Sequence, residues 1–361
     1  MTDIQLDRVP TASDVLLDVE NLTVGFPTDD GLVQAVRGVS YQLRRGESLG
    51  IVGESGSGKS VTSLAVLGLL PKTAQVTGSV RLAGEELLGR TEDQYAKIRG
   101  NKIAMIFQDP LTSLNPVYRV GYQLSEAVLA HHDISKKAAH DRAVELLGIV
   151  GIPYPEQRVN AYPHELSGGM RQRVVIAIAM ANNPDVMIAD EPTTALDVTV
   201  QAQVLEALEA AREETGAALV LITHDLGIIA GRADRVCVMY AGKLVESGTV
   251  DDVFYRPRMP YSLGLLGSLP RLDEEGREKL TPIVGAPPSL VNLPPGCPFT
   301  PRCPIAQEVC EEVEPDLTPT DSAGHRAACH FHERLVGAKP GHLFTVTPTA
   351  LEAPAELEVQ A

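Results

Sequence analysis

Positive charge is scarce in this sequence of 361 residues, which has 31 lysines and arginines against 47 aspartates and glutamates and a formal net charge of −16. Such a balance argues against nonspecific nucleic-acid binding and against a polybasic membrane anchor. Apolar residues are not scarce, because their 44% share is ample for packed cores. The length allows about two to three domains.

Long apolar runs are also missing. No stretch reaches the roughly 18 apolar residues of a membrane-spanning helix, and no N-terminal run is typical of a signal peptide. If the protein works at a membrane, we therefore expect another protein to hold it there. Internal repeats and sustained heptads are absent as well.

Cysteine is limited to five residues, and four of them fall between positions 297 and 329. The fifth, Cys237, lies in the apolar run RVCVMY, which predicts a small buried side chain. In a chain without an export signal, a cysteine cluster indicates metal ligation before disulfides.

Short apolar runs alternate with helical stretches between residue 15 and about residue 253. The runs lie at 48–52, 103–107, 186–189, 218–222 and 236–240. This alternation predicts an α/β domain with a mainly parallel sheet. Residues 16–43 instead resemble antiparallel strands, and residues 111–182 lack a buried strand and predict an inserted helical subdomain.

The composition divides the chain into four parts. We expect a frayed start at residues 1–14 and an α/β domain at 15–255. Prolines and the cysteine cluster mark a small irregular C-terminal domain at 256–335. The remaining 336–361 are rich in Ala, Pro and Glu and predict a disordered tail.

The sequence GESGSGKS at 53–60 matches a phosphate-binding loop. A glycine-rich turn is the simpler alternative, but the apolar strand before the motif and the helical stretch after it favour phosphate. We expect Lys59 to reach the β- and γ-phosphates of ATP and Ser60 to bind Mg²⁺. The expected ATP contacts are Gly53, Ser55, Gly56, Ser57, Gly58, Lys59 and Ser60.

Polar residues follow three other predicted strands. Asp190 and Glu191 end the run VMIADE, Gln108 follows IAMIF and His224 follows ALVLIT. A strand that ends in a solvated acidic turn is the alternative, but ligands of open α/β sheets bind at this edge. We expect Asp190 to hold Mg²⁺ and Glu191 to act as general base. A lone histidine after a strand is more often structural, but this edge would bring His224 and Gln108 toward the γ-phosphate, so we expect both to be catalytic with Glu191.

The ordered motifs resemble those of the ATPase subunit of an ATP-binding-cassette transporter over roughly 240 residues. They are the phosphate loop, Gln108, LSGGM at 166–170, VMIADE, ALD at 195–197 and His224. The resemblance implies head-to-tail dimers in which Ser167, Gly168 and Gly169 meet the partner's ATP. It also implies an adenine contact at Phe26 (or Tyr41), a signalling role for Asp197 and binding of Mg²⁺ and water by Gln108.

Finer motifs resemble the oligopeptide and dipeptide importers. They are IFQDPLTSLNPVYRVGYQLSE, SGGMRQRV, DEPTTALDVTVQAQ, GCPFTPRCP and HRAACH. One departure is Met259-Pro260-Tyr261, where the family's extension usually opens with His-Pro-Tyr. The form Met-Arg-Gln-Arg resembles one of two paralogous ATPases, which implies a heterodimer.

Cys297, Cys303, Cys310 and Cys329 are separated by five, six and eighteen residues, unlike the two-residue gaps of a zinc ribbon. Four thiolates suit either Zn²⁺ or a [4Fe–4S] cluster, and unligated thiols are the third possibility. The resemblance to peptide importers favours iron–sulfur. Because this segment lies outside the cassette, we expect it to have a structural role and no direct part in hydrolysis.

The resemblance implies an ATPase that powers peptide import at the cytoplasmic face of the inner membrane. It implies a paralogous ATPase subunit, two transmembrane permease subunits and an extracytoplasmic peptide-binding protein as partners, and no nucleic acid. Importers of nickel or glutathione share the subfamily and remain alternatives. A soluble cassette ATPase of another class is disfavoured by the single cassette and the acidic charge, and a metal-sensing regulator by the intact Glu191 and His224.

Overall fold

The structure, a computed structural model, describes residues 14–29, 31–194, 196–269 and 282–344. Residues 1–13 and 345–361, where we predicted a frayed start and most of a disordered tail, lie outside this range. The described part of that tail, residues 336–344, includes helix α13 (Pro340–Leu343), and Phe344 after it is 8% exposed. The packed part of the chain therefore extends past our boundary at 336.

Five parallel strands lie side by side in the larger sheet, whose order is β11-β12-β10-β9-β3-β8-β7-β6, with β6 at the edge. Each corresponds to one of the five apolar runs expected from the sequence, because strands covered on both faces consist almost wholly of apolar residues. These strands are β3 (Ser48–Val52), β6 (Ile103–Ile106), β7 (Val186–Asp190), β8 (Ala218–Thr223) and β9 (Arg235–Tyr240).

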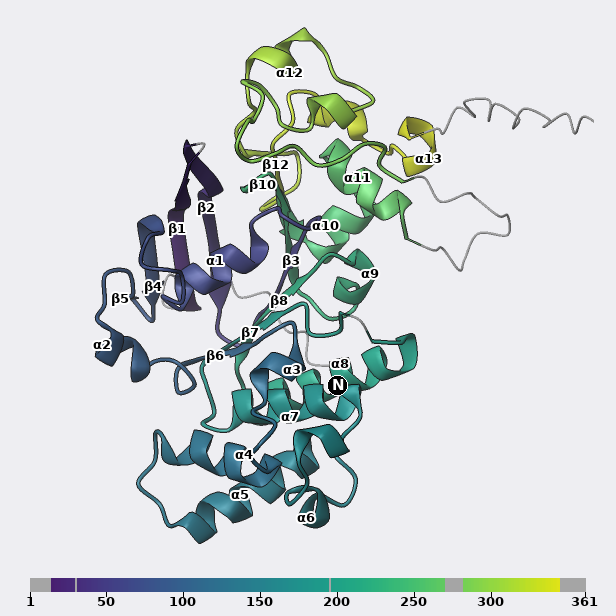
Figure 1. The fold of residues 1–361 in the computed structure, drawn as a ribbon. Helices are drawn as coiled ribbons and strands as arrows, with labels where there is room; N and C mark the ends of the chain where they lie inside the picture. The colour runs from purple at the N-terminus through teal and green to yellow at the C-terminus, as the bar shows by residue number, and fades with distance from the viewer. Residues whose placement is uncertain (1–13, 30, 195, 270–281, 345–361) are drawn as a thin grey trace, which may run out of the picture.

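A second, antiparallel sheet has the order β2-β1-β4-β5. Its first two strands cover the region where antiparallel strands were expected, whereas β4 and β5 were not predicted. Their bounds are β1 (Val15–Thr28), β2 (Gly31–Arg44), β4 (Gln75–Leu82) and β5 (Glu85–Glu86). Helix α1 (Lys59–Val66) contacts both β1 and β2 (Figure 1).

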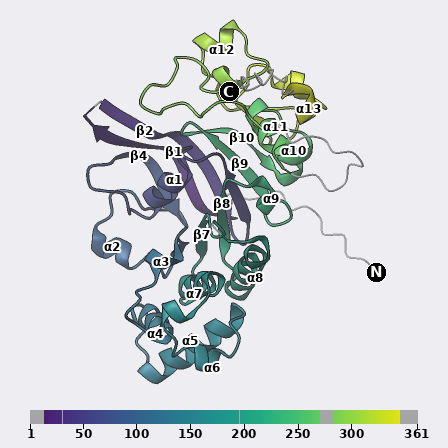
Figure 2. The same ribbon diagram turned by 45° about the vertical axis from the view of Figure 1, so that its right-hand side comes forward.

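Helices without an intervening strand connect β6 to β7 in the described residues. They lie together at the lower end of the molecule in Figures 1 and 2, and the apolar faces of the larger ones join the core cluster beneath the parallel sheet. They are α3 (Pro110–Ser113), α4 (Val120–Leu129), α5 (Lys136–Ile149), α6 (Pro155–Arg158), the 3₁₀ turn η2 (Pro163–Glu165) and α7 (Gly168–Met180).

Four further helices complete the cassette, the name used here for residues 15–255. They are α2 (Glu92–Ala96), α8 (Val198–Thr215), α9 (Leu226–Ile229) and α10 (Val250–Tyr255). Helix α8 packs against α7. No helix within the described ranges is both long enough and apolar enough to cross a bilayer.

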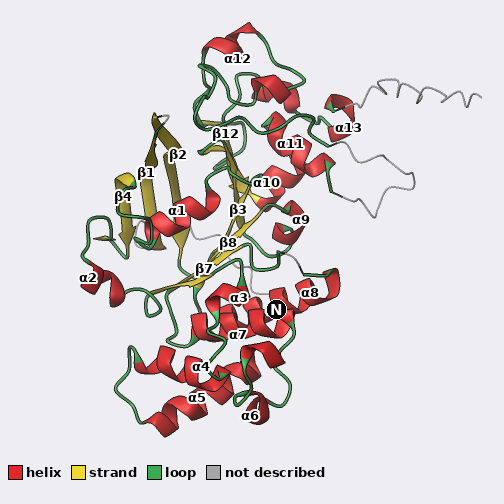
Figure 3. Ribbon diagram, in the orientation of Figure 1, coloured by secondary structure: helices red, strands yellow, loops and turns green. Residues whose placement is uncertain are grey.

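The C-terminal extension, residues 256–335, consists mostly of loops and lies at the opposite end from the helical subdomain (Figure 3). It does not stand apart from the cassette, because its strand β12 pairs with β10 at the edge of the larger sheet. The cassette strand β10 spans Lys243–Thr249. The described elements of the extension are α11 (Pro260–Gly267), η3 (Thr300–Arg302), α12 (Glu308–Glu312), β11 (Thr318–Pro319), β12 (Arg326–Ala327) and η4 (His332–Leu335).

A buried polar pair joins the extension to this edge. Nε2 of His325 lies 2.8 Å from a carboxylate oxygen of Glu246, and both side chains are 0% exposed. The backbone N–H of Arg258 donates to the same oxygen. A buried carboxylate depends on such partners, because its desolvation is costly, and both described partners of Glu246 bind one of its two oxygens.

We therefore expect His325→Ala to destabilise the protein by about 3 kcal/mol, because it leaves the Glu246 carboxylate buried with one partner fewer. Thermal and chemical unfolding of the full chain measures the change. His330→Ala is the matched control, since His330 is an exposed histidine of the same extension that bonds a backbone carbonyl. Equal stability of the two variants would contradict the assigned role of the pair.

Candidate functional site

The phosphate loop, residues 53–60, connects β3 to α1 and lines a cavity of about 680 Å³. Gly58, which caps α1, has φ of 102°. A Cβ atom there would lie 2.5 Å from the carbonyl oxygen of Ala35, so only glycine fits this turn. The other residues that line the cavity are Ala35, Val61, Gln108, Glu191, His224 and Leu290.

Lys59 begins α1 and is 4% exposed. Its ammonium group donates to the carbonyl oxygens of Gly53, at 2.7 Å, and Glu54, at 3.0 Å. Burial lowers the pKa of Lys59, although the carboxylates of Glu191 and Asp190 oppose that shift. A buried cation beside the N-terminus of a helix suits a polyanion such as a triphosphate.

Asp190 ends β7 next to this loop, and its carboxylate accepts a hydrogen bond of 3.0 Å from the Ser60 hydroxyl. Burial raises the pKa of Asp190, and the neighbouring Glu191 raises it further. A divalent cation would favour the ionised form of this carboxylate. The hydroxyl and carboxylate oxygens are the donors that Mg²⁺ prefers, so Ser60 and Asp190 fit the predicted Mg²⁺ site.

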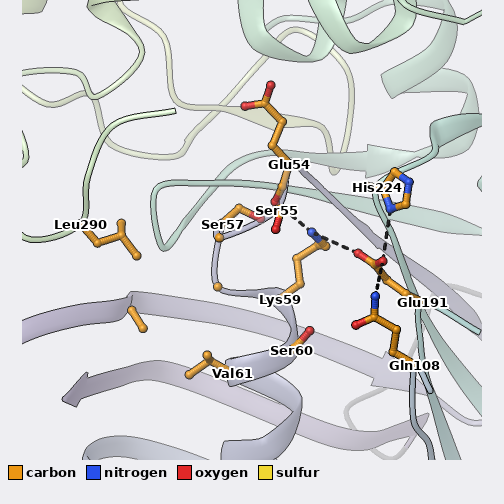
Figure 4. A pocket seen from close by; sticks show the side chains of 13 residues that line it. Glu54, Ser55, Ser57, Lys59, Ser60, Val61, Gln108, Glu191, His224 and Leu290 are labelled. Carbon is orange, nitrogen blue, oxygen red and sulfur yellow. Dashed lines mark hydrogen bonds and ion pairs between the residues drawn. The ribbon is translucent and has the colours of Figure 1, made fainter. Parts of the chain in front are cut away.

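Glu191 lies at the wall of the cavity with side chains from three other segments around it (Figure 4). One carboxylate oxygen accepts hydrogen bonds from Gln108, at 3.2 Å, and Thr194, at 2.8 Å, and lies 3.3 Å from Nδ1 of His224. The other oxygen lies 4.0 Å from the Lys59 ammonium. The structure thus brings the three predicted catalytic residues together.

The backbone of Glu191 has φ of 46°, the left-handed region that a residue with a long side chain rarely adopts. Such a conformation costs on the order of 1–3 kcal/mol and persists where the surroundings fix it. Here the N–H of Glu191 donates to the carbonyl of Ile222 at 2.9 Å. In this conformation the carboxylate lies at the cavity, and no feature of the sequence indicated it.

The predicted partner-site residues lie elsewhere. Ser167 caps α7, where its hydroxyl accepts from the N–H of Met170 at 3.3 Å, and Asp197 caps α8 in the same way. Ser167 and Gly168 are exposed, whereas Gly169 is buried. A Cβ at Gly169 would lie 2.2 Å from Val200, so this glycine is required by the packing of α7 on α8. Ser167 and Gly168 remain available to a second molecule.

The predicted adenine contacts do not line the cavity. Phe26 packs, half-buried, against the core of the antiparallel sheet, and Tyr41 is a buried core residue. Apolar side chains of Val61 and Leu290 line the cavity instead, and Figure 4 places Leu290 across from the phosphate loop. Leu290 belongs to the C-terminal extension, so nothing in the local sequence linked it to a nucleotide site.

The four clustered cysteines line one small cavity of about 20 Å³. Burial raises the pKa of Cys297, that of Cys303 to about 11 and that of Cys329 to about 12, and the neighbouring thiols add to each shift. Within the described part of the chain, no three His, Cys, Asp or Glu residues are arranged to hold a metal ion. The donors of the predicted cluster are thus gathered around this cavity: Cys310 is buried, and the other three are partly buried against the core.

Cys237 is 4% exposed in β9, and burial raises its pKa to about 11. It is the small buried residue that was predicted.

Two family models match the chain. Residues 36–194 match the ABC transporter family, and residues 245–310 match the oligopeptide/dipeptide transporter C-terminal region. The second match begins in β10 and includes Cys297, Cys303 and Cys310. It ends before Cys329.

Relatives cover nearly the whole chain. The dipeptide transport ATP-binding protein DppD of Bacillus subtilis is 53% identical over 88% of this chain and 95% of its own length. The oligopeptide transport ATP-binding protein OppD of Escherichia coli is 50% identical, over 91% and 98%. OppD of Mycobacterium bovis is 55% identical over 94% of this chain, which spans only 55% of that longer protein.

A solved dimeric bacterial ABC transporter cassette matches with a TM-score of 0.58 and 29% identity, covering 65% of this chain and 99% of its own. A second solved structure, a post-hydrolysis state of such a cassette with ADP and Pi, matches equally well at 28% identity. These matches confirm the predicted cassette fold and the predicted resemblance. The chain belongs to the ABC transporter family, among the ATP-binding proteins of oligopeptide and dipeptide transport.

Proposed function

We propose that this chain hydrolyses ATP to power the import of di- or oligopeptides through a membrane transporter. The observation that carries the proposal is the position of Glu191, held by Gln108, Thr194 and His224 at the wall of the phosphate-loop cavity. The peptide substrate rests on the names of the relatives and on the matched C-terminal region.

The chain's own groups suggest the division of work. The backbone N–H groups of the phosphate loop and the Lys59 ammonium bind the phosphates. Ser60 and Asp190, with Gln108, would hold Mg²⁺, which would supply positive charge beside the phosphates. Glu191 takes the proton of the attacking water, and His224 and Gln108 orient that water and the γ-phosphate.

We further propose that two such ATPases, one of them a paralogue, share their nucleotide sites head to tail. The exposed Ser167 and Gly168 support this proposal, because α7 presents their N-terminal N–H groups to solvent and away from the chain's own cavity. The other proposed partners are two transmembrane permease subunits and an extracytoplasmic peptide-binding protein. The complex would lie at the cytoplasmic face of the inner membrane.

Exposed apolar side chains in the segment around and after Gln108 support a permease contact. Phe107, Val117, Tyr118 and Tyr122 are all exposed, and the rings of Tyr118 and Tyr122 stack at 4.9 Å. Large apolar side chains gathered on an exposed segment are typical of a protein contact. A permease docked here would touch the segment that begins with a catalytic residue.

We also propose a [4Fe–4S] cluster, with Zn²⁺ as the alternative, on Cys297, Cys303, Cys310 and Cys329. Four soft donors around one cavity suit such a group. Burial disfavours the thiolate forms of Cys297, Cys303 and Cys329 by raising their pKa values, so metal binding and the exact placement of the four side chains would be coupled.

We expect Glu191→Gln to leave ATP binding intact and to lower hydrolysis by about 10²–10⁴-fold, because the amide cannot accept the proton. The variant should also retain an ATP-bound dimer. ATP turnover and gel filtration with ATP measure both effects. Glu209→Gln, in α8 and paired with Arg212, is the control. A Glu191 variant with most of its turnover would exclude the general-base role.

Ser167→Arg should impair the site whose phosphate loop belongs to the other subunit, and Lys59→Ala should impair the opposite site. Nucleotide trapping resolved by site in the heterodimer distinguishes them. Ser135→Arg is the matched control, because Ser135 is an exposed serine that caps α5. Loss of nucleotide trapping at the same site in both variants would contradict the composite arrangement.

Protein purified without oxygen should be brown and contain about four irons per chain. Cys303→Ser should lose the colour and make the extension sensitive to protease, whereas Glu191-dependent hydrolysis persists. Cys237→Ala should keep the iron, since Cys237 lies in β9. A colourless protein with one zinc would favour Zn²⁺, and an ordered extension without metal would refute both.

A further inference from the structure

The C-terminal extension contacts the phosphate loop through Arg302. Its guanidinium donates two hydrogen bonds to the carboxylate of Glu54, at 2.6 and 2.8 Å. The side chain of Arg302 is 4% exposed. Glu54 is the second residue of the phosphate loop and is 248 positions away in sequence. A paired, buried fork of this kind fixes both the position and the charge of its carboxylate.

The extension also holds the backbone of the same residue. The hydroxyl oxygen of Tyr261, in α11, accepts a hydrogen bond of 2.8 Å from the N–H of Glu54. Tyr261 is 0% exposed and its ring packs against those of Tyr240 and Phe299. The guanidinium of Arg302 lies 5.9 Å from the centres of these last two rings. The two contacts therefore come from one rigid aromatic cluster.

The contacts of Arg302 and Tyr261 with Glu54 bear on ligand binding because of the position of Glu54. Glu54 lines the cavity in which a triphosphate would lie, and Figure 4 shows its side chain extending away from Lys59. A free carboxylate at this place would repel a polyanion across a short distance. Arg302 both neutralises the carboxylate and holds it turned away from the Lys59 ammonium.

The turn that carries Arg302 lies between two of the clustered cysteines. The N–H of Thr300 donates to the carbonyl of Cys297 at 3.0 Å, and the N–H of Cys303 donates to the carbonyl of Thr300 at 3.2 Å. The cysteine segment is therefore in direct contact with the nucleotide site. This contact qualifies the expectation of a purely structural extension.

We propose that Arg302 and Tyr261 are positioning residues of the nucleotide site, and that through Glu54 the C-terminal extension sets the affinity of this chain for ATP. The proposal rests on the proposed function only in taking ATP as the ligand of the phosphate loop. Hydrolysis itself depends on Glu191, so the extension acts on binding and not on the chemical step.

The first test is Arg302→Met, measured by titrating the full chain with Mg²⁺ and a non-hydrolysable ATP analogue. We expect the affinity to fall about tenfold, because Glu54 then faces the phosphates without its partner. In the transporter complex, KM for ATP should rise by a similar factor while kcat changes little. Tyr261→Phe, which removes only the hydroxyl, should lower the affinity about threefold.

The second test adds Glu54→Gln to Arg302→Met. The double variant has neither the cation nor the repelling carboxylate, so its affinity should return to within about threefold of the wild type. Arg302→Lys keeps the charge but not the fork and should lie between the wild type and Arg302→Met. If Arg302→Met folds poorly, Arg302→Lys provides the test of affinity in its place.

Arg258→Met is the matched control. Arg258 is an arginine of the same extension, 5% exposed, and it pairs with Asp321 instead of the phosphate loop. The control should lose thermal stability much as Arg302→Met does, but keep its affinity within about twofold.

Three results would overturn the proposal. They are unchanged affinity in Arg302→Met, an equal loss in Arg258→Met, and a double variant as weak as the single one. Failure of the proposed function is a separate outcome, because then the wild-type chain itself would not bind the ATP analogue.

Discussion

The carboxylate of Glu191 is held by groups from several separate segments of the chain, and this convergence requires the parallel order of the central strands. Gln108 follows β6, Glu191 and Thr194 follow β7, His224 follows β8 and Lys59 follows β3. Neighbouring parallel strands end at the same edge of a sheet, so the order β3-β8-β7-β6 brings these residues together. The neighbouring strand also helps to hold the backbone of Glu191 at φ of 46°, because the N–H of Glu191 donates to the carbonyl of Ile222 in β8.

The sequence predicted this centre because its signals are local. Strands buried on both faces are unbroken apolar runs, and the phosphate loop needs glycine at defined positions, such as Gly58. By contrast, β4 has mostly exposed or half-exposed polar residues, and β12 is two residues long, so neither produces an apolar pattern. Contacts such as that of Leu290 with the cavity or Arg302 with Glu54 join distant segments. A single sequence contains no signal for them.

Motifs also predicted residue roles less accurately than residue positions. The motif presents Ser167, Gly168 and Gly169 as one exposed turn. In the structure Ser167 and Gly168 are exposed, whereas Gly169 is buried. Gly169 must be a glycine because Val200 occupies the place of a Cβ atom. For Phe26 the motif leaves two roles open. An aromatic residue in an antiparallel strand predicts equally a ligand contact and a core side chain, and only the packing against the sheet distinguishes the two.

Two glutamates that serve the same nucleotide are supported by different parts of the chain. Glu191 takes its side-chain partners from the cassette, whereas the carboxylate and the N–H of Glu54 take theirs, Arg302 and Tyr261, from the extension. Under the proposed function, the groups that bind ATP and the group that activates water would therefore be able to change independently. Because Arg302 lies in the turn between Cys297 and Cys303 and pairs with Glu54, we expect a change in the packing of these thiols to act on the phosphate loop. An extension built this way would regulate how readily ATP is bound and leave the rate of its hydrolysis to the sheet.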